Sequence, residues 1–114
     1  MYNNTNIVKL SDVLSKILGN TIYLQIILMY YEERNMVTNI TGIAKALGKS
    51  QATVRKAIKD MIDAGILEES LVGRSIVVRL KMDGHYTKTI IDFVERMDSI
   101  IKERYFELES PRRL

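Results

Sequence analysis

The chain has no cysteine and only one histidine among its 114 residues. The lack of cysteine excludes disulfides, thiolate metal sites and cysteine nucleophiles. The single histidine, His85, is expected at the surface near the start of a helix, where it lacks the partner ligands that a metal site needs. We therefore expect no metal and no cofactor.

Membrane-spanning and catalytic signatures are also missing. No apolar run approaches the ~20 residues that a membrane span requires. Residues 1–6 are polar and lack the early basic cluster of a signal peptide, so a cytoplasmic protein is expected. No glycine-rich phosphate loop or nucleophile–base pair occurs, and the paired acids at 32–33 and 68–69 have no metal ligand beside them. We do not expect an enzyme.

The positive charge is concentrated in one segment. The net charge is +3, and residues 41–82 hold eight Lys and Arg residues against four Asp and Glu residues. The rest of the chain has one more acidic than basic residue. A basic surface confined to one module is typical of a DNA-binding protein. A solvated basic face without a partner is the alternative.

Apolar residues recur at intervals of three and four and predict five helices. We expect them over residues 7–18, 21–34, 41–47, 51–64 and 84–109, with caps at Asn20 or Thr21, Thr41, Ser50 and Asp83. Gly19, Gly48 and Gly65 are the expected stops. The second helix is apolar almost all round, which predicts that it is buried on more than one side and supports the domain.

Branched residues predict short strands. Residues 36–38 are expected to form a very short one, and residues 67–72 and 75–80 to form a hairpin. The loop Gly73-Arg74 suits a type II′ turn because glycine comes first. That register pairs Leu71 with Ile76, Leu67 with Leu80 on the same face, and Glu68 with Arg79 on the other face, where their charges attract.

Residues 20–80 resemble a winged helix-turn-helix domain. Ala44, Gly48 and Val54 match the small residue, the turn glycine and the packing residue of that motif, whereas Lys49 stands where the family often has an aliphatic residue. The segment is similar to MarR-like regulators and to small archaeal winged-helix proteins. The resemblance implies a mainly α fold with a small β-hairpin. Residues 20–82 would be the DNA-binding domain, with dimerisation helices in residues 1–19 and 83–114.

The candidate DNA contacts lie on the outward side of the fourth helix and at the hairpin tip. They are Lys49, Ser50, Gln51, Ala52, Arg55, Lys56, Lys59 and Arg74. Stepping about 100° per residue from Val54 places Ala52 and Lys56 nearly opposite the buried face. Gln51 could pair with adenine, Arg55 with guanine, and Ala52 could contact a thymine methyl. Ser50 and the lysines suit phosphates, and Arg74 suits the minor groove or a phosphate. For any one of them, solvated surface is the alternative.

The terminal helices carry apolar stripes that a three-helix module cannot cover. The predicted dimer interface comprises Ile7, Leu10, Leu14 and Ile17, together with Ile90, Val94, Met97, Ile101 and Leu108. The spacing in the last helix alternates four and three, as in a coiled coil, and is interrupted at Arg104. A two-fold dimer would present two recognition helices to half-sites about 34–36 Å apart. The alternative is that the terminal helices pack within one chain.

These patterns favour a homodimeric, nucleoid-associated transcriptional regulator that binds double-stranded DNA. One alternative is an architectural, chromatin-like protein without strong sequence specificity. Another is a winged-helix module that binds proteins, although the basic charge of residues 41–82 argues against it. The chain's tyrosines could line a small-molecule effector cleft, but packing in the core or an interface is their commoner role.

Overall fold

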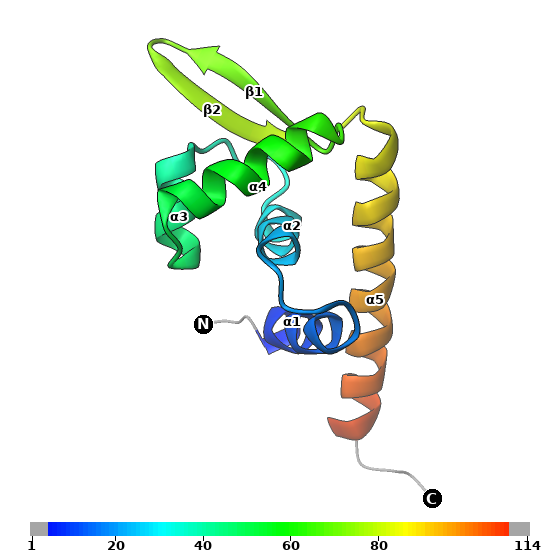
Figure 1. The fold of residues 1–114 in the computed structure, drawn as a ribbon. Coiled ribbons are helices and arrows are strands. Elements are labelled where there is room, and N and C mark those ends of the chain that lie inside the picture. Colours follow the sequence, from blue (N-terminus) through cyan, green and yellow to red (C-terminus); the bar gives the residue numbers. More distant parts are fainter. Residues whose placement is uncertain (1–4, 110–114) are drawn as a thin grey trace, which may run out of the picture.

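The computed structural model describes the backbone of residues 5–109 and the side chains of residues 10–104. Over this range the chain forms five helices and one antiparallel hairpin (Figure 1). The elements are α1 (Thr5–Leu18), α2 (Ile22–Glu32), α3 (Ile40–Leu47), α4 (Gln51–Asp63), β1 (Leu67–Val72), β2 (Ser75–Leu80) and α5 (His85–Glu109). The mainly helical α+β class is therefore as predicted, and α2 ends two residues earlier than expected.

Local capping groups set the ends of the helices around the turn. The Ser50 hydroxyl accepts a hydrogen bond of 3.1 Å from the Thr53 amide and caps α4, as predicted. Gly48 ends α3 at φ 66°, a left-handed conformation that glycine adopts without a steric penalty. Thr21 caps α2 by accepting from the Leu24 amide.

Two predicted caps were wrong. Asn39, not Thr41, caps α3: its side chain accepts a hydrogen bond of 2.7 Å from the Gly42 amide, and Thr41 lies inside the helix. The last helix begins at His85, so Gly84 rather than Asp83 directly precedes it. Gly84 is buried, and a Cβ there would collide with the carbonyl oxygen of Gly65. Close backbone packing thus determines where this helix begins.

The hairpin has the predicted register. Leu67 pairs with Leu80, Glu68 with Arg79 and Leu71 with Ile76. Gly73 has φ 63°, as the first residue of a type II′ turn requires. Thr38, in the short extended segment before α3, forms a single bridge to the hairpin. In this bridge the Val78 amide donates a hydrogen bond of 2.6 Å to the carbonyl oxygen of Thr38.

Helix α2 lies between two apolar cores, which confirms its predicted supporting role. Ile26 and Tyr30 are fully buried in a cluster that also contains α3, α4 and the hairpin base. Leu24 and Leu28 face a second cluster shared with α1 and α5. In Figure 1, α1 crosses α5 at the end far from the hairpin. None of the helices between residues 5 and 109 has the length and apolar character needed to cross a membrane.

Candidate nucleic-acid interface

The α3–α4 unit is held by the residues that carry the resemblance. Ala44 and Val54 are buried in the first cluster, where the small side chain of Ala44 lets the two helices approach. The carbonyl oxygen of Ala44 accepts a hydrogen bond of 3.0 Å from the Lys49 amide, which closes the turn after Gly48. The exposed start of α4 is therefore fixed by packing on one side and by backbone hydrogen bonds at its end.

All eight candidate DNA contacts are exposed. On α4, Val54, Ile58 and Met61 face the core, whereas the predicted outward residues Gln51, Ala52, Arg55, Lys56 and Lys59 face solvent. Lys49 and Ser50 lie at the turn, and Arg74 lies at the hairpin tip. The structure thus brings the α4 and turn residues together at one end of the α3–α4 unit, with Arg74 on a separate projection (Figure 1).

A shallow groove joins α4 to the hairpin. Gln51 and Arg55 line it on one side, Glu69 and Ile76 on the other, and the start of α3 closes it with Asn39, Ile40 and Thr41. Glu69 was not among the predicted site residues. The predicted hairpin register could have found it, because Glu69 shares a face with Leu67 and Leu80, which point toward the helices. A carboxylate beside Arg55 and Gln51 could accept a hydrogen bond from cytosine N4.

The cations on α4 differ in whether they form ion pairs with neighbouring carboxylates. Lys56 lies 3.0 Å from Asp60, and Lys59 lies 3.6 Å from Asp63. Hydrogen bonds from the Tyr23 hydroxyl and from Lys56 lower the pKa of the Asp60 carboxyl. The hydrogen bond to Asp60 in turn raises the pKa of Lys56. Lys56 is thus tethered to Asp60 on its own helix, and Tyr23 links that carboxylate to α2.

Three other candidate cations have no such tether. Within the described part of the chain, Lys49, Arg55 and Arg74 form no ion pair. An unpaired guanidinium keeps its planar set of donors available for a guanine edge or a phosphate. Arg55 is the one that also lines the groove.

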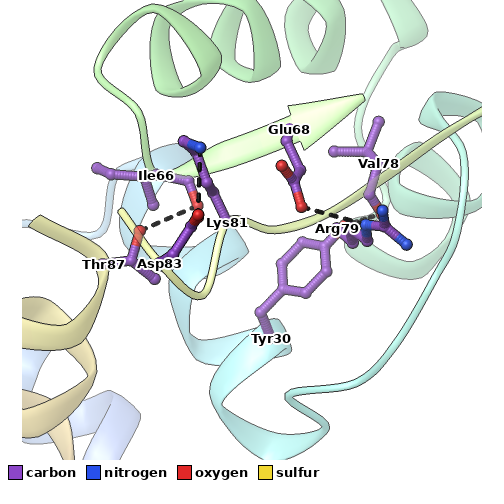
Figure 2. A network of polar contacts seen from close by, with 8 residues as sticks. All are labelled: Tyr30, Ile66, Glu68, Val78, Arg79, Lys81, Asp83 and Thr87. Carbon is purple, nitrogen blue, oxygen red and sulfur yellow. Dashed lines mark hydrogen bonds and ion pairs between the residues drawn. The ribbon is translucent and has the colours of Figure 1, made fainter. Parts of the chain in front are cut away.

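The hairpin base is anchored to the helices on both sides (Figure 2). The Tyr30 hydroxyl on α2 donates to the Val78 carbonyl, and the Thr87 hydroxyl on α5 donates to the Ile66 carbonyl. Arg79 and Glu68 form the predicted cross-strand ion pair at 3.2 Å. These contacts fix the direction in which the hairpin projects from the helices.

Helix α5 presents two stripes, and the residues of the predicted dimer interface are divided between them. One stripe is buried within the chain and consists of Thr87, Ile91, Val94, Asp98 and Ile101. The other faces outward and consists of the exposed Tyr86, Phe93 and Ile100, with the partly buried Ile90 and Met97 along its edge. Met97 also packs against the second cluster. The prediction mixed the two, because residues adjacent in sequence, such as Phe93 and Val94, fall on neighbouring faces.

Several predicted interface residues are already covered by their own chain. Leu10 and Leu14 of α1 pack with Val94 and Ile101 in the second cluster. They are not free to meet another subunit, so the terminal helices do pack within one chain, as the alternative stated. Ile17 is exposed, and Ile90 and Met97 are partly buried. Ile7 and Leu108 lie outside the residues whose side chains are described.

The described tyrosines of α2 serve packing and hydrogen bonding. Tyr30 is fully buried in the first cluster. The hydroxyl of Tyr31 donates a hydrogen bond of 2.8 Å to the carboxylate of Asp98. Burial, together with that hydrogen bond, raises the pKa of Tyr31 from 10.0 to about 12. Among the described residues, no group of three His, Cys, Asp or Glu side chains is placed to hold a metal ion.

Comparison with known proteins gives a structural neighbour but no family. The fold is shared with a solved structure. It is described as "Crystal structure of RV1404 from Mycobacterium tuberculosis", with a TM-score of 0.64 at 12% identity over 92% of this chain and 73% of that chain. At this identity the likeness concerns the fold alone. No protein-family model and no curated protein matches the sequence.

Proposed function

We propose that the chain is a homodimeric transcriptional regulator that binds double-stranded DNA, with α4 in the major groove and the hairpin as a wing beside it. The supporting observation is that Gln51 and Arg55 line one groove with the hairpin, and that Arg55 forms no ion pair with any described residue. The major groove is wide enough for a helix, and these two side chain types read adenine and guanine edges.

The other candidates have positioning roles in this proposal. Lys49 and Ser50, at the turn before α4, would bind a phosphate together with the exposed amides of the helix start. Lys59 and Lys56 would approach the backbone further along the helix, with Lys56 leaving Asp60 to do so. Such contacts set the register of the protein on the duplex without reading its sequence.

The dimer in this proposal uses the outward stripe of α5. Tyr86, Phe93 and Ile100 are spaced by seven residues and are exposed, with Ile90 and Met97 between them. This alternation of four and three is the pattern of a helix seam that packs against a partner helix. A two-fold dimer formed along this seam would carry two copies of α4, as a pseudo-palindromic site requires.

Selection of bound sequences from a random DNA pool is the main test. A two-fold symmetric consensus supports a regulator and gives its half-site spacing. Equal binding of all sequences with a steep salt dependence would support the architectural alternative instead. Binding without salt dependence would favour the protein-binding module, because phosphate contacts release counterions.

A matched pair of double variants tests the α4 face. Arg55→Ala with Lys56→Ala removes one unpaired and one paired cation from α4 and should abolish binding while the fold persists. Lys88→Ala with Arg96→Ala removes the same two charges from α5, where Lys88 is exposed and Arg96 pairs with Asp92 at 2.9 Å. That control should bind like the unmodified protein. Equal affinity for both variants in an anisotropy titration would reject α4 as the DNA-binding face.

A further inference from the structure

The outer end of the hairpin is apolar and fully in solvent. Leu71, Val72 and Ile76 are 70%, 58% and 57% exposed. At the hairpin base, by contrast, Leu67 and Leu80 are buried. Single exposed apolar residues are ordinary, but a cluster at the end of a projecting element indicates an interaction site. We call Leu71 and Ile76, which are direct cross-strand partners, the tip pair.

The tip pair lies on the side of the hairpin that faces α4. In the observed register, Leu71 and Ile76 share a face with Glu69 and Val78. Ile76, Glu69 and Val78 line the same groove as Gln51 and Arg55. A ligand lying along α4 and this groove would therefore meet the tip pair next. Val72 points to the opposite face.

The tip pair is also remote from the outward stripe of α5. Figure 1 shows the hairpin extending beyond α3 and α4, with its turn on the side of the molecule away from α5. A dimer formed along α5 would leave the tip uncovered. The apolar surface of the tip pair must therefore be covered by a different binding partner.

The charge at the tip favours a polyanion as that occupant. Residues 70–78 carry one charge, the guanidinium of Arg74, whereas the carboxylates of Glu68 and Glu69 lie further along β1 from the turn. Arg74 forms no ion pair with the described residues and sits in the turn between the two strands. Arginine is attracted to a narrow minor groove and to phosphates. Leucine and isoleucine are among the side chains that architectural proteins insert between base steps from the minor groove.

We propose that the tip pair is a wedge that enters the minor groove and partly unstacks one base step, so that the protein bends the DNA it binds. This inference rests on the proposed function and adds deformation of the duplex to it. Arg74 holds the adjacent backbone, while Leu71 and Ile76 bury their apolar surface between bases. Unstacking costs free energy, and it costs least where a base is mismatched. The wedge therefore gives the protein a preference for steps that open easily.

The test variant is Leu71→Thr with Ile76→Thr. Threonine is branched at Cβ, which suits a strand, and both positions are exposed, so the hairpin should persist. Val72→Thr is the matched control, because it makes the same kind of change on the opposite face of the same hairpin end. Arg74 stays in place in all variants, so electrostatic binding is preserved.

Two measurements report the wedge without knowledge of a target sequence. The first is ligation of a duplex of about 100 bp, below the ~150 bp persistence length of DNA, into rings. The second is the affinity, at fixed salt, for a duplex with and without one central T·T mismatch. The unmodified protein and Val72→Thr should accelerate ring closure and bind the mismatched duplex about tenfold more tightly. The tip-pair variant should still bind, without accelerating closure and without preferring the mismatch.

Each other outcome overturns the wedge in a distinguishable way. If the tip-pair variant closes rings and prefers the mismatch like the unmodified protein, DNA binding stands and the wedge is rejected. If it loses a dimer that the unmodified protein forms without DNA, seen by light scattering, then the tip contacts a second copy instead. If the unmodified protein binds neither duplex even at low salt, where phosphate contacts alone give measurable affinity, the wedge and the proposed function fail together.

Discussion

The hydroxyl of Tyr30 on α2 donates a buried hydrogen bond of 2.7 Å to the carbonyl oxygen of Val78 on β2, 48 residues later (Figure 2). Val78 is also the residue that bridges to Thr38. Burial raises the pKa of Tyr30, so its hydroxyl keeps its proton and remains a donor. One contact thus ties the helix between the two cores to strand β2 and limits how the hairpin can move relative to α4.

Replacing Tyr30 by Phe should lower the free energy of unfolding by about 1–2 kcal/mol. The change leaves the Val78 carbonyl with only the Thr38 amide at 3.3 Å. Urea unfolding would measure the loss. Tyr23→Phe is the control, because its hydroxyl bonds to Asp60 at the surface and should matter less. Equal losses in the two variants would show that the buried hydrogen bond of Tyr30 stabilises the fold no more than the surface hydrogen bond of Tyr23.

Stability should fall at high pH through Tyr31. Its pKa is about 12 in the folded protein against 10.0 ordinarily, so below pH 10 both states hold the proton. Between about pH 10 and 12 the unfolded chain loses this proton first, so the free energy of unfolding decreases as the pH rises. Tyr30 adds to the effect with the same sign. Urea midpoints measured from pH 9 to 11 should fall less steeply in Tyr31→Phe than in Tyr86→Phe, whose ring is exposed.

Replacing Asp60 by Asn should tighten DNA binding. Asp60 holds Lys56 at 3.0 Å and accepts from Tyr23, so the amide would free the lysine and remove a negative charge from the α4 surface. Lys56 would no longer have to break this pair to reach a phosphate, so the dissociation constant at low salt should fall about twofold. Asp12→Asn breaks a similar pair, with Lys16 on α1, and should leave the dissociation constant unchanged. An unchanged dissociation constant in Asp60→Asn would mean that Lys56 does not reach the backbone.

Placing acids on the outward stripe of α5 should separate the subunits. Phe93→Glu with Ile100→Glu puts two charges at exposed positions of the proposed seam, where they would be desolvated in a dimer. Light scattering should then give the mass of one chain, 13.1 kDa, with unchanged helical circular dichroism. Ser99→Glu, exposed on another face of the same helix, should keep the mass of the unmodified protein. A dimer that survives the double change would exclude this stripe.

Features set by neighbouring residues were determined by the sequence itself. The hairpin register follows from alternation along two strands joined by Gly73-Arg74, and the observed pairs match it. The stop at Gly48 and the cap at Ser50 follow in the same way, because backbone preference and short-range hydrogen bonds decide both. The outward residues of α4 could be predicted from the helical period once Val54 was taken as buried.

Features that depend on how elements approach one another were decided only by the tertiary structure. The hydrogen bond from Tyr23 to Asp60, which links α2 to the surface of α4, depends on how these two helices approach each other. The placement of Glu69 beside Arg55 depends on the angle of the hairpin, which Tyr30 sets from α2. The apolar stripe of α5 was visible in the sequence, but only the packing of α1 and α2 divided it into a buried and an outward face. Periodicity identifies which residues are apolar, whereas the neighbouring elements determine which of them remain uncovered.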